Sequence, residues 1–379
     1  MASRLSNINK KDILKMFFEK EVQDDALDDY SGYFEFFQEQ IAHAKINKKT
    51  DMCQQIQDIV KVMQQYPDTT LPQLVARLNP PPSTPSTHDA VDFRVIVDCA
   101  LRVWVGVNSR RPAFDDTLIK DGWGSFRWDD ESSLCDFVWR VFYPGKKFGE
   151  RPDPEREETS SETSTVQSKL THPLTAVNLE RYPKIGILWT PYLHGHLRFS
   201  SSYKELQVVE QKQWLQDAKS FLEKRGKQCR LGPGAGQWSQ DGSMYKGEGG
   251  RELPPYPVPP EVLEEALLSL DYLFPNNNQT ETFLKRHAKK LSIPEGERPR
   301  LKRFVYYHDR LIEVAQEFLN PPRNWSTIWS DNRNPIQFLI FWFGLLVVLL
   351  TLVLGIVASV LAGLQYGVAR YPTSDAGPQ

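Results

Sequence analysis

Two histidines and a glycine-rich stretch are the residues that most resemble a chemical site. His194 and His196 flank Gly195, and on a β-strand they would point the same way, as two ligands of a metal ion do. A zinc site needs three or four ligands, and no Cys or His lies at a recognisable spacing from this pair. The GPGAGQ stretch at 232–237 contains a proline and lacks the following Lys-Ser/Thr of a phosphate-binding loop. We therefore expect no metal and no cofactor, and we expect the two histidines to be structural or surface residues.

The common catalytic motifs are also missing from the sequence. It contains no G-x-S-x-G elbow, no H-E-x-x-H helix and no set of kinase motifs. We therefore expect that the chain is not an enzyme. An enzyme with an unrecognised active site, acting on a lipid or a membrane-proximal substrate, stays open as the alternative. The net charge of -2 over 379 residues argues against a whole-protein nucleic-acid binder.

A cluster of basic residues is the most informative charge feature. Eight basic residues against two glutamates leave a local net charge of +6 between residues 285 and 303. Anionic lipid attracts each basic residue in close contact by about 1 kcal/mol, so an anionic membrane surface is one expected partner. A solvated helix face and loop is the alternative, and nucleic acid is not expected because no stacking aromatics interleave the charges. The basic patch comprises Lys285, Arg286, Lys289, Lys290, Arg298, Arg300, Lys302 and Arg303.

A long apolar run near the end of the sequence predicts a transmembrane helix. Residues 338–364 are 27 consecutive residues without a charge. As a helix they would extend about 40 Å, and the hydrocarbon core of a bilayer is about 30 Å thick. Aromatic residues of the kind that anchor helices at membrane interfaces flank this run, namely Trp325, Trp329, Trp342 and Tyr366.

Small residues repeat every four positions inside the apolar run. Gly355, Ser359 and Gly363 would lie on one face of the helix. Small side chains at this spacing let a second helix approach closely, so a homodimer through this face is a possible partner arrangement. The common occurrence of Gly and Ser in membrane helices is the alternative explanation.

The placement of the apolar run also predicts an orientation. The first 20 residues contain no apolar stretch typical of a signal peptide, and only 15 residues follow Leu364. We therefore expect a tail-anchored, single-pass protein with its N-terminal region in the cytoplasm, in a membrane that the sequence does not identify. Four scattered cysteines suit a reducing compartment, whereas the sequons at Asn278 and Asn324 would matter only in a secretory lumen.

Hydrophobic periodicity predicts a mainly α fold with a small β-hairpin element. Three apolar stripes at helical spacing fall within residues 9–63. Further helices are expected at 71–78, 89–105, 131–142, 211–225, 260–274 and 303–320. Alternating apolar residues between 185 and 209 predict short strands. One C-terminal transmembrane helix completes the expected fold.

Composition divides the chain into eight expected parts. Proline, glycine and charged Ser/Thr-rich stretches mark the boundaries, since such segments do not bury a core. The parts are an N-terminal helical region (1–78), a Pro-rich linker (79–87), a helical region (88–145), a disordered acidic Ser/Thr-rich segment (146–170), an α+β region (171–320) with a Gly/Pro loop at 229–259, a juxtamembrane segment (321–337), the transmembrane helix (338–364) and a short tail (365–379).

Three stretches resemble an uncharacterised family of filamentous-fungal single-pass membrane proteins. They are WDDESSLCDFVWRVFYP (128–144), LTAVNLERYPKIGILWTPYLHGHLRF (174–199), and PPEVLEEALLSLDYLFP with the later segment that leads through Trp329, Asp331, Arg333, Asn334 and Gln337 into the apolar run. The sequence departs from the family pattern at Pro191 to Gly195, where relatives more often have an acidic stretch. The resemblance implies a C-terminal membrane anchor and carries no activity with it. We expect a membrane-tethered interaction or signalling scaffold.

Overall fold

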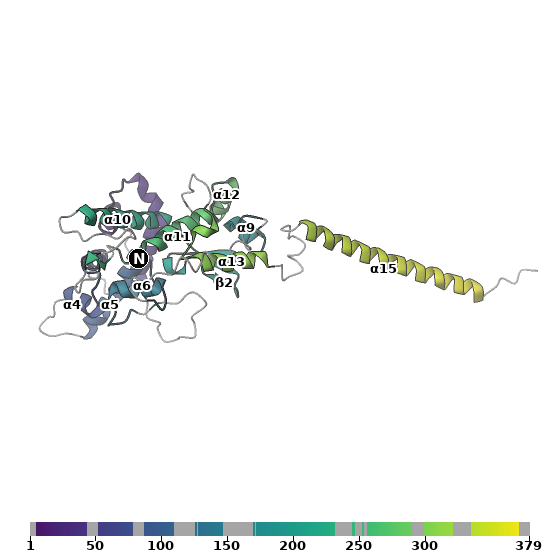
Figure 1. Ribbon diagram of the computed structural model, residues 1–379, viewed down its shortest axis with the longest axis horizontal. Coiled ribbons are helices and arrows are strands. Elements are labelled where there is room, and N and C mark those ends of the chain that lie inside the picture. The colour runs from purple at the N-terminus through teal and green to yellow at the C-terminus, as the bar shows by residue number, and fades with distance from the viewer. Residues whose placement is uncertain are drawn as a thin grey trace, which may run out of the picture. The chain divides into compact units, whose positions relative to one another are not determined.

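The computed structural model describes most of the chain in two compact units, residues 1–320 and 321–379 (Figure 1). Each unit is treated by itself. The described residues are 5–43, 52–78, 87–109, 126, 128–146, 170, 172–231, 245–246, 252–253, 256–289, 291, 299–320 and 335–370. Most of the expected Pro-rich linker and acidic segment, and residues 321–334, lie outside this set.

The first half of the larger unit is helical, as the periodicity predicts. Its elements are α1 (Asn7–Phe18), η1 (Asp25–Tyr30), α2 (Ser31–His43), α3 (Met52–Gln65), α4 (Leu71–Leu78), α5 (Thr87–Val105) and α6 (Leu134–Phe142). Helix α6 begins three residues later than the expected 131, because the Ser133 hydroxyl caps it by accepting the Asp136 N–H. Helix α5 begins within the stretch expected to be a linker.

A small sheet lies in the second half of this unit. Strands β1 (Gly186–Thr190) and β3 (Glu205–Val209) are parallel neighbours, and β2 (Phe199–Ser200) pairs antiparallel with β3. Only β2 and β3 form the expected hairpin. Strand β1 is parallel to β3 and is joined to it by residues 191–204, which contain η3 (Leu193–Gly195) and β2. Strands β4 (Tyr245–Lys246) and β5 (Glu252–Leu253) form a separate antiparallel pair. The mainly α fold with a small sheet is confirmed.

The second half of this unit also contains helices. They are α9 (Ala176–Arg181), α10 (Lys212–Leu231), α11 (Pro260–Leu273), α12 (Asn278–Arg286), η4 (Leu301–Arg303) and α13 (His308–Leu319). Helices α10 and α11 pack side by side, as Figure 1 shows. The prediction of one helix from 303 is wrong, because residues 304–307 are extended or turned before α13 begins. Helix α12 was not expected as a separate element.

One hydrophobic core joins elements from both halves of the unit. Tyr33 on α2 donates a hydrogen bond to the Val103 carbonyl of α5, and Tyr256 donates one to the neighbouring Trp104 carbonyl. Tyr256 and Val258 are fully buried although they belong to the stretch expected to be a flexible Gly/Pro loop. Tertiary packing therefore places the end of that stretch in the core.

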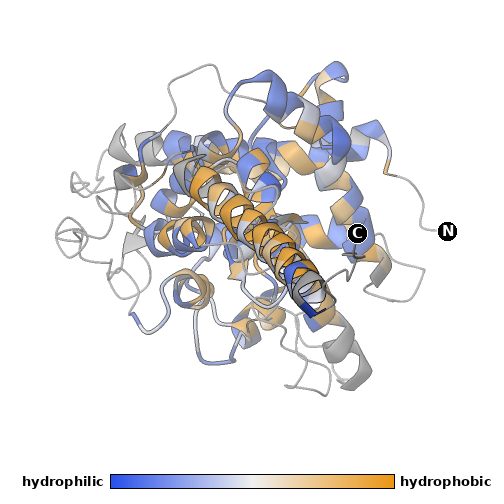
Figure 2. Ribbon diagram, turned by 90° about the vertical axis from the view of Figure 1, so that its right-hand side faces the viewer, coloured by the Kyte–Doolittle hydropathy of each residue, from blue (hydrophilic) through white to orange (hydrophobic). Residues whose placement is uncertain are grey.

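The smaller unit contains α15 (Pro335–Arg370). It is longer at both ends than the expected 338–364, since Pro335 is tolerated in the first turn of a helix and no further proline occurs before Pro372. Figure 2 shows that α15 is hydrophobic along nearly its whole length, whereas helices of the larger unit alternate between hydrophobic and hydrophilic residues.

Candidate functional site

The apolar segment of α15 has the properties of a membrane span. Leu339–Gly367 comprises 29 residues, an 18-residue stretch within it has a mean hydropathy of 3.0, and none of its side chains is buried within the protein. A helix of this length extends about 44 Å, which exceeds the roughly 30 Å hydrocarbon thickness. The hydroxyls of Thr351 and Ser359 donate to the carbonyls of Val347 and Gly355, each at 2.8 Å. Both hydroxyls are thus satisfied within the helix, as a lipid environment requires.

Two of the four predicted interface aromatics lie on α15. Trp342 is partly exposed near its start, and Tyr366 is exposed near its end with the Arg370 guanidinium 5.9 Å from its ring. Their 24-residue separation corresponds to about 36 Å along a helix, close to the distance between the two interfaces of a bilayer. Trp325 and Trp329 lie outside the described residues.

The predicted small-residue face is open in the single chain. A methyl group added at Gly355 or Gly363 would meet no atom within 4 Å outside the helix backbone. The hydroxyl of Ser359 donates to the Gly355 carbonyl and therefore lies against the helix backbone. Association through Gly355, Ser359 and Gly363 stays a prediction.

The basic patch of residues 285–303 is partly neutralised by the fold. Lys285 lies 3.8 Å from Glu281, one helical turn away. Arg286 pairs with Glu180 of α9, and Lys289 pairs with Glu210, which follows β3. These two glutamates lie far away in sequence, so the local charge count overlooked them.

The remainder of the basic patch divides into exposed and undescribed residues. Arg300, which precedes η4, and Arg303, which is its last residue, are both exposed. Lys290, Arg298 and the side chain of Lys302 lie outside the described residues. Arg300 and Arg303 are therefore the described residues of the basic patch that are exposed and not part of the ion pairs above.

The two histidines occupy a turn instead of the expected strand. His194 belongs to η3 and His196 follows it, and both are buried. The His194 Nδ1 accepts a 3.5 Å hydrogen bond from the Asn108 N–H, whereas His196 bonds to Val209 and Ser269. Among the described residues no group of three or more His, Cys, Asp or Glu is placed to hold a metal ion. The pair therefore has separate structural contacts.

Among the described residues, the His196–Ser269 contact most resembles a catalytic base and nucleophile, but its hydrogen bonds oppose that role. The Val209 N–H donates to His196 Nδ1 over 3.1 Å, so the neutral ring carries its proton on Nε2. Nε2 then donates to Ser269 Oγ over 2.6 Å, and Oγ donates to the Ala266 carbonyl over 2.7 Å. A base must accept the serine proton, and this imidazole has no free nitrogen to do so. Burial and the positive charge of Arg310 lower the pKa of His196 to about 3.

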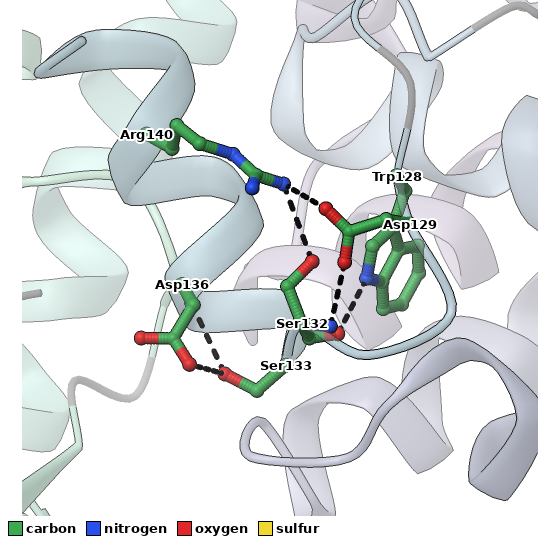
Figure 3. Close-up of polar contacts among 6 residues, drawn as sticks. All are labelled: Trp128, Asp129, Ser132, Ser133, Asp136 and Arg140. Carbon is green, nitrogen blue, oxygen red and sulfur yellow. Dashed lines mark hydrogen bonds and ion pairs between the residues drawn. The ribbon is translucent and has the colours of Figure 1, made fainter. Parts of the chain in front are cut away.

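A polar turn precedes α6 in the first stretch of the family resemblance (Figure 3). Asp129 accepts the Ser132 N–H over 2.7 Å and pairs with Arg140 over 2.6 Å. The Trp128 indole donates to the Ser132 carbonyl over 2.9 Å, which closes the turn. Partial burial acts to raise the pKa of Asp129, but hydrogen bonds from Ser132 and Arg140 hold it at about 2. These contacts position α6 and leave no uncompensated group for chemistry.

A buried carboxylate organises the start of α13. Glu265 of α11 accepts three backbone N–H groups, those of Val305, Tyr306 and Tyr307, each over 2.9 Å. These three residues directly precede α13, so the helix offers no partner for their N–H groups. Burial raises the pKa of Glu265, and the three hydrogen bonds oppose that shift. Sequence reasoning missed this residue, since a glutamate within an amphipathic helix looks like a surface residue.

Comparison with known proteins returned no relative. No protein-family model, no curated protein and no solved structure matches the chain.

Proposed function

We propose that the chain is a membrane-tethered interaction or signalling scaffold, with residues 1–320 held at a membrane surface by α15. The observation that carries this proposal is the surface of Leu339–Gly367, which is strongly apolar, carries no charged residue and is unburied. Water would be an unfavourable environment for such a surface, whereas lipid accommodates it. The hydrogen bonds of the His196–Ser269 pair favour a structural role for these residues over an enzymatic one.

Extraction from membranes tests the anchor. The full chain should stay with the membrane pellet in alkaline carbonate. Replacing Leu352 and Val353 with Arg should release it, since each Arg at a helix centre costs about 2.5–3.5 kcal/mol on insertion scales. Replacing the same residues with Ala is the matched control and should leave the chain in the pellet. Release of the unmodified chain by carbonate would reject the anchor.

We further propose that residues 1–320 face the cytoplasm. Cys99 and Cys135 are buried free thiols, which suits a reducing compartment. Protease added outside sealed microsomes should digest the larger unit and spare the apolar helix. A mobility shift of the chain on glycosidase treatment would overturn this orientation, because Asn278 is exposed at the start of α12. Proximity labelling with the tagged full chain would then identify protein partners.

The exposed arginines of the basic patch support contact with anionic lipid. Hydrogen exchange of residues 299–303 should slow when the full chain is moved from phosphatidylcholine nanodiscs to nanodiscs that also contain phosphatidylserine. Replacing Arg300 and Arg303 with Gln should remove the difference. Replacing Arg286 with Gln is the control, since its charge is already paired with Glu180. Equal exchange rates in both lipids would reject the contact.

A further inference from the structure

The length of α15 suits some membranes better than others. Trp342 and Tyr366 are amphipathic aromatics of the kind found at the two interfaces of a bilayer, and 24 residues separate them. Along a helix this separation is about 36 Å. At the average transmembrane tilt of about 20°, a helical segment of about 36 Å spans about 34 Å of bilayer thickness. That span exceeds the typical hydrocarbon thickness of about 30 Å.

The two aromatics require different tilts in thin and thick membranes. The hydrocarbon layer is about 27 Å thick in the endoplasmic reticulum and about 32–33 Å thick in the sterol-rich plasma membrane. To place Trp342 and Tyr366 at both interfaces, α15 needs a tilt of about 41° in the thinner layer and about 25° in the thicker one. Transmembrane helices are tilted by about 20° on average and by about 40° at most. The spacing of the two aromatics therefore fits the thicker layer.

The apolar surface of α15 is longer than the distance between the two aromatics. Leu339–Gly367 contains no Asp, Glu, Lys or Arg, and a helix of its 29 residues is about 44 Å long. None of its side chains is buried within the described part of the protein. A thin bilayer would leave more of this surface in contact with headgroups and water than a thick bilayer would.

The helix has no break that would shorten it. Helix α15 (Pro335–Arg370) is continuous, as Figure 1 shows, and no further proline occurs before Pro372. Sharp kinks in helices usually arise at proline. The hydroxyls of Thr351 and Ser359 bond back to helix carbonyls, so neither requires water inside the bilayer. Tilting of the whole helix is therefore the main way to reduce its span.

We propose that α15 selects a thick, sterol-rich bilayer of the plasma-membrane type over the thin bilayer of the endoplasmic reticulum. This proposal rests on the proposed membrane anchor and adds the class of membrane to it. A mismatch between the length of a helix and the thickness of a bilayer costs free energy for each Å, and this cost sorts proteins among membranes. The anchored chain should therefore accumulate in the membrane where α15 needs the smaller tilt.

Removal of about one helical turn from α15 tests the proposal. Deletion of residues 346–349 from the tagged full chain shortens the distance between Trp342 and Tyr366 to about 30 Å, which spans about 27 Å at a tilt of about 26°. Microscopy of cells should show the unmodified chain mainly at the plasma membrane, and a several-fold larger share of the shortened chain in the endoplasmic reticulum. Reinsertion of the same four residues after Leu354 is the matched control. It should restore the original distribution, because it restores the length at a different position.

Alkaline carbonate extraction of the same three chains separates this proposal from the anchor itself. All three should stay in the membrane pellet, because the shortened apolar segment is still longer than the roughly 20 residues that a span needs. Release of the unmodified chain would reject the anchor and the thickness preference together. Retention in the pellet with the same cellular distribution of the unmodified and the shortened chain would reject the thickness preference alone. Failure of the reinserted residues to restore the distribution would reject it as well.

Discussion

Tyr30 donates a 2.5 Å hydrogen bond to Asp217 Oδ2, which joins residues that are 187 positions apart in the chain. Lys20 donates to the other oxygen of the same carboxylate. Asp217 is 3% exposed, so these partners compensate a nearly buried charge. Burial raises the pKa of Tyr30, and the neighbouring carboxylate adds to that shift, so the phenol remains a donor. This contact ties the segment after α1 to α10.

Removal of the Tyr30 hydroxyl tests this connection. Tyr30→Phe should lower the free energy of unfolding by about 1.5–3 kcal/mol, because a hydrogen bond to a charged, buried group is lost. Denaturant unfolding of the full chain in detergent measures the change. Tyr66→Phe, at a tyrosine that is 43% exposed, should change stability by less than about 0.5 kcal/mol. Equal effects of the two substitutions would show that the Asp217 contact contributes nothing specific.

The buried ring of His196 should make the folded state sensitive to acid. Its folded pKa of about 3 lies below the ordinary value of 6.5, so the unfolded chain binds the extra proton between these values. Stability should therefore fall as the pH falls from 6.5 towards 3, by up to about 1.4 kcal/mol per pH unit. His196→Gln should unfold with a shallower pH dependence across this window. Parallel curves for the two proteins would contradict the assignment.

Glu265 should stabilise the start of α13 through its charge. Glu265→Gln keeps the shape of the side chain but replaces one acceptor oxygen with an N–H donor that faces backbone N–H groups. We expect a loss of about 1.5–3 kcal/mol in unfolding free energy and faster hydrogen exchange at residues 305–307. Glu264→Gln is the matched control on the exposed side of the same helix. Unchanged exchange at 305–307 would count against the role of Glu265.

The small-residue face of α15 should support a homodimer. Replacing Gly355 and Ser359 with Leu should reduce the crosslinked dimer of the full chain in membranes several-fold, since the close approach of two helices is lost. Val353→Leu and Val357→Leu enlarge side chains on the opposite side of the helix and should leave the dimer unchanged. An unchanged dimer after the Gly355 and Ser359 substitutions would eliminate this face.

Local patterns in the sequence determined the elements that depend on neighbouring residues. The apolar run of α15 and the helical stripes of the N-terminal region were predicted, because periodicity and length act within a few turns of chain. The bounds of α4, Leu71–Leu78, were predicted to the residue. Helix α13 was placed too early, since its start depends on Glu265, 43 residues before His308.

The tertiary structure alone decided which charges are compensated. The sequence places Arg286 and Lys289 in a basic patch, but Glu180 and Glu210 reach them from elements distant along the chain. Conversely, Arg310 looks unremarkable in the sequence, yet folding brings its guanidinium onto the carbonyls of His194 and His196. Electrostatic interactions depend on distance in space and on burial, neither of which is encoded in local spacing. The apolar helix α15 could therefore be predicted from the sequence, and the ion pairs of Arg286 and Lys289 could not.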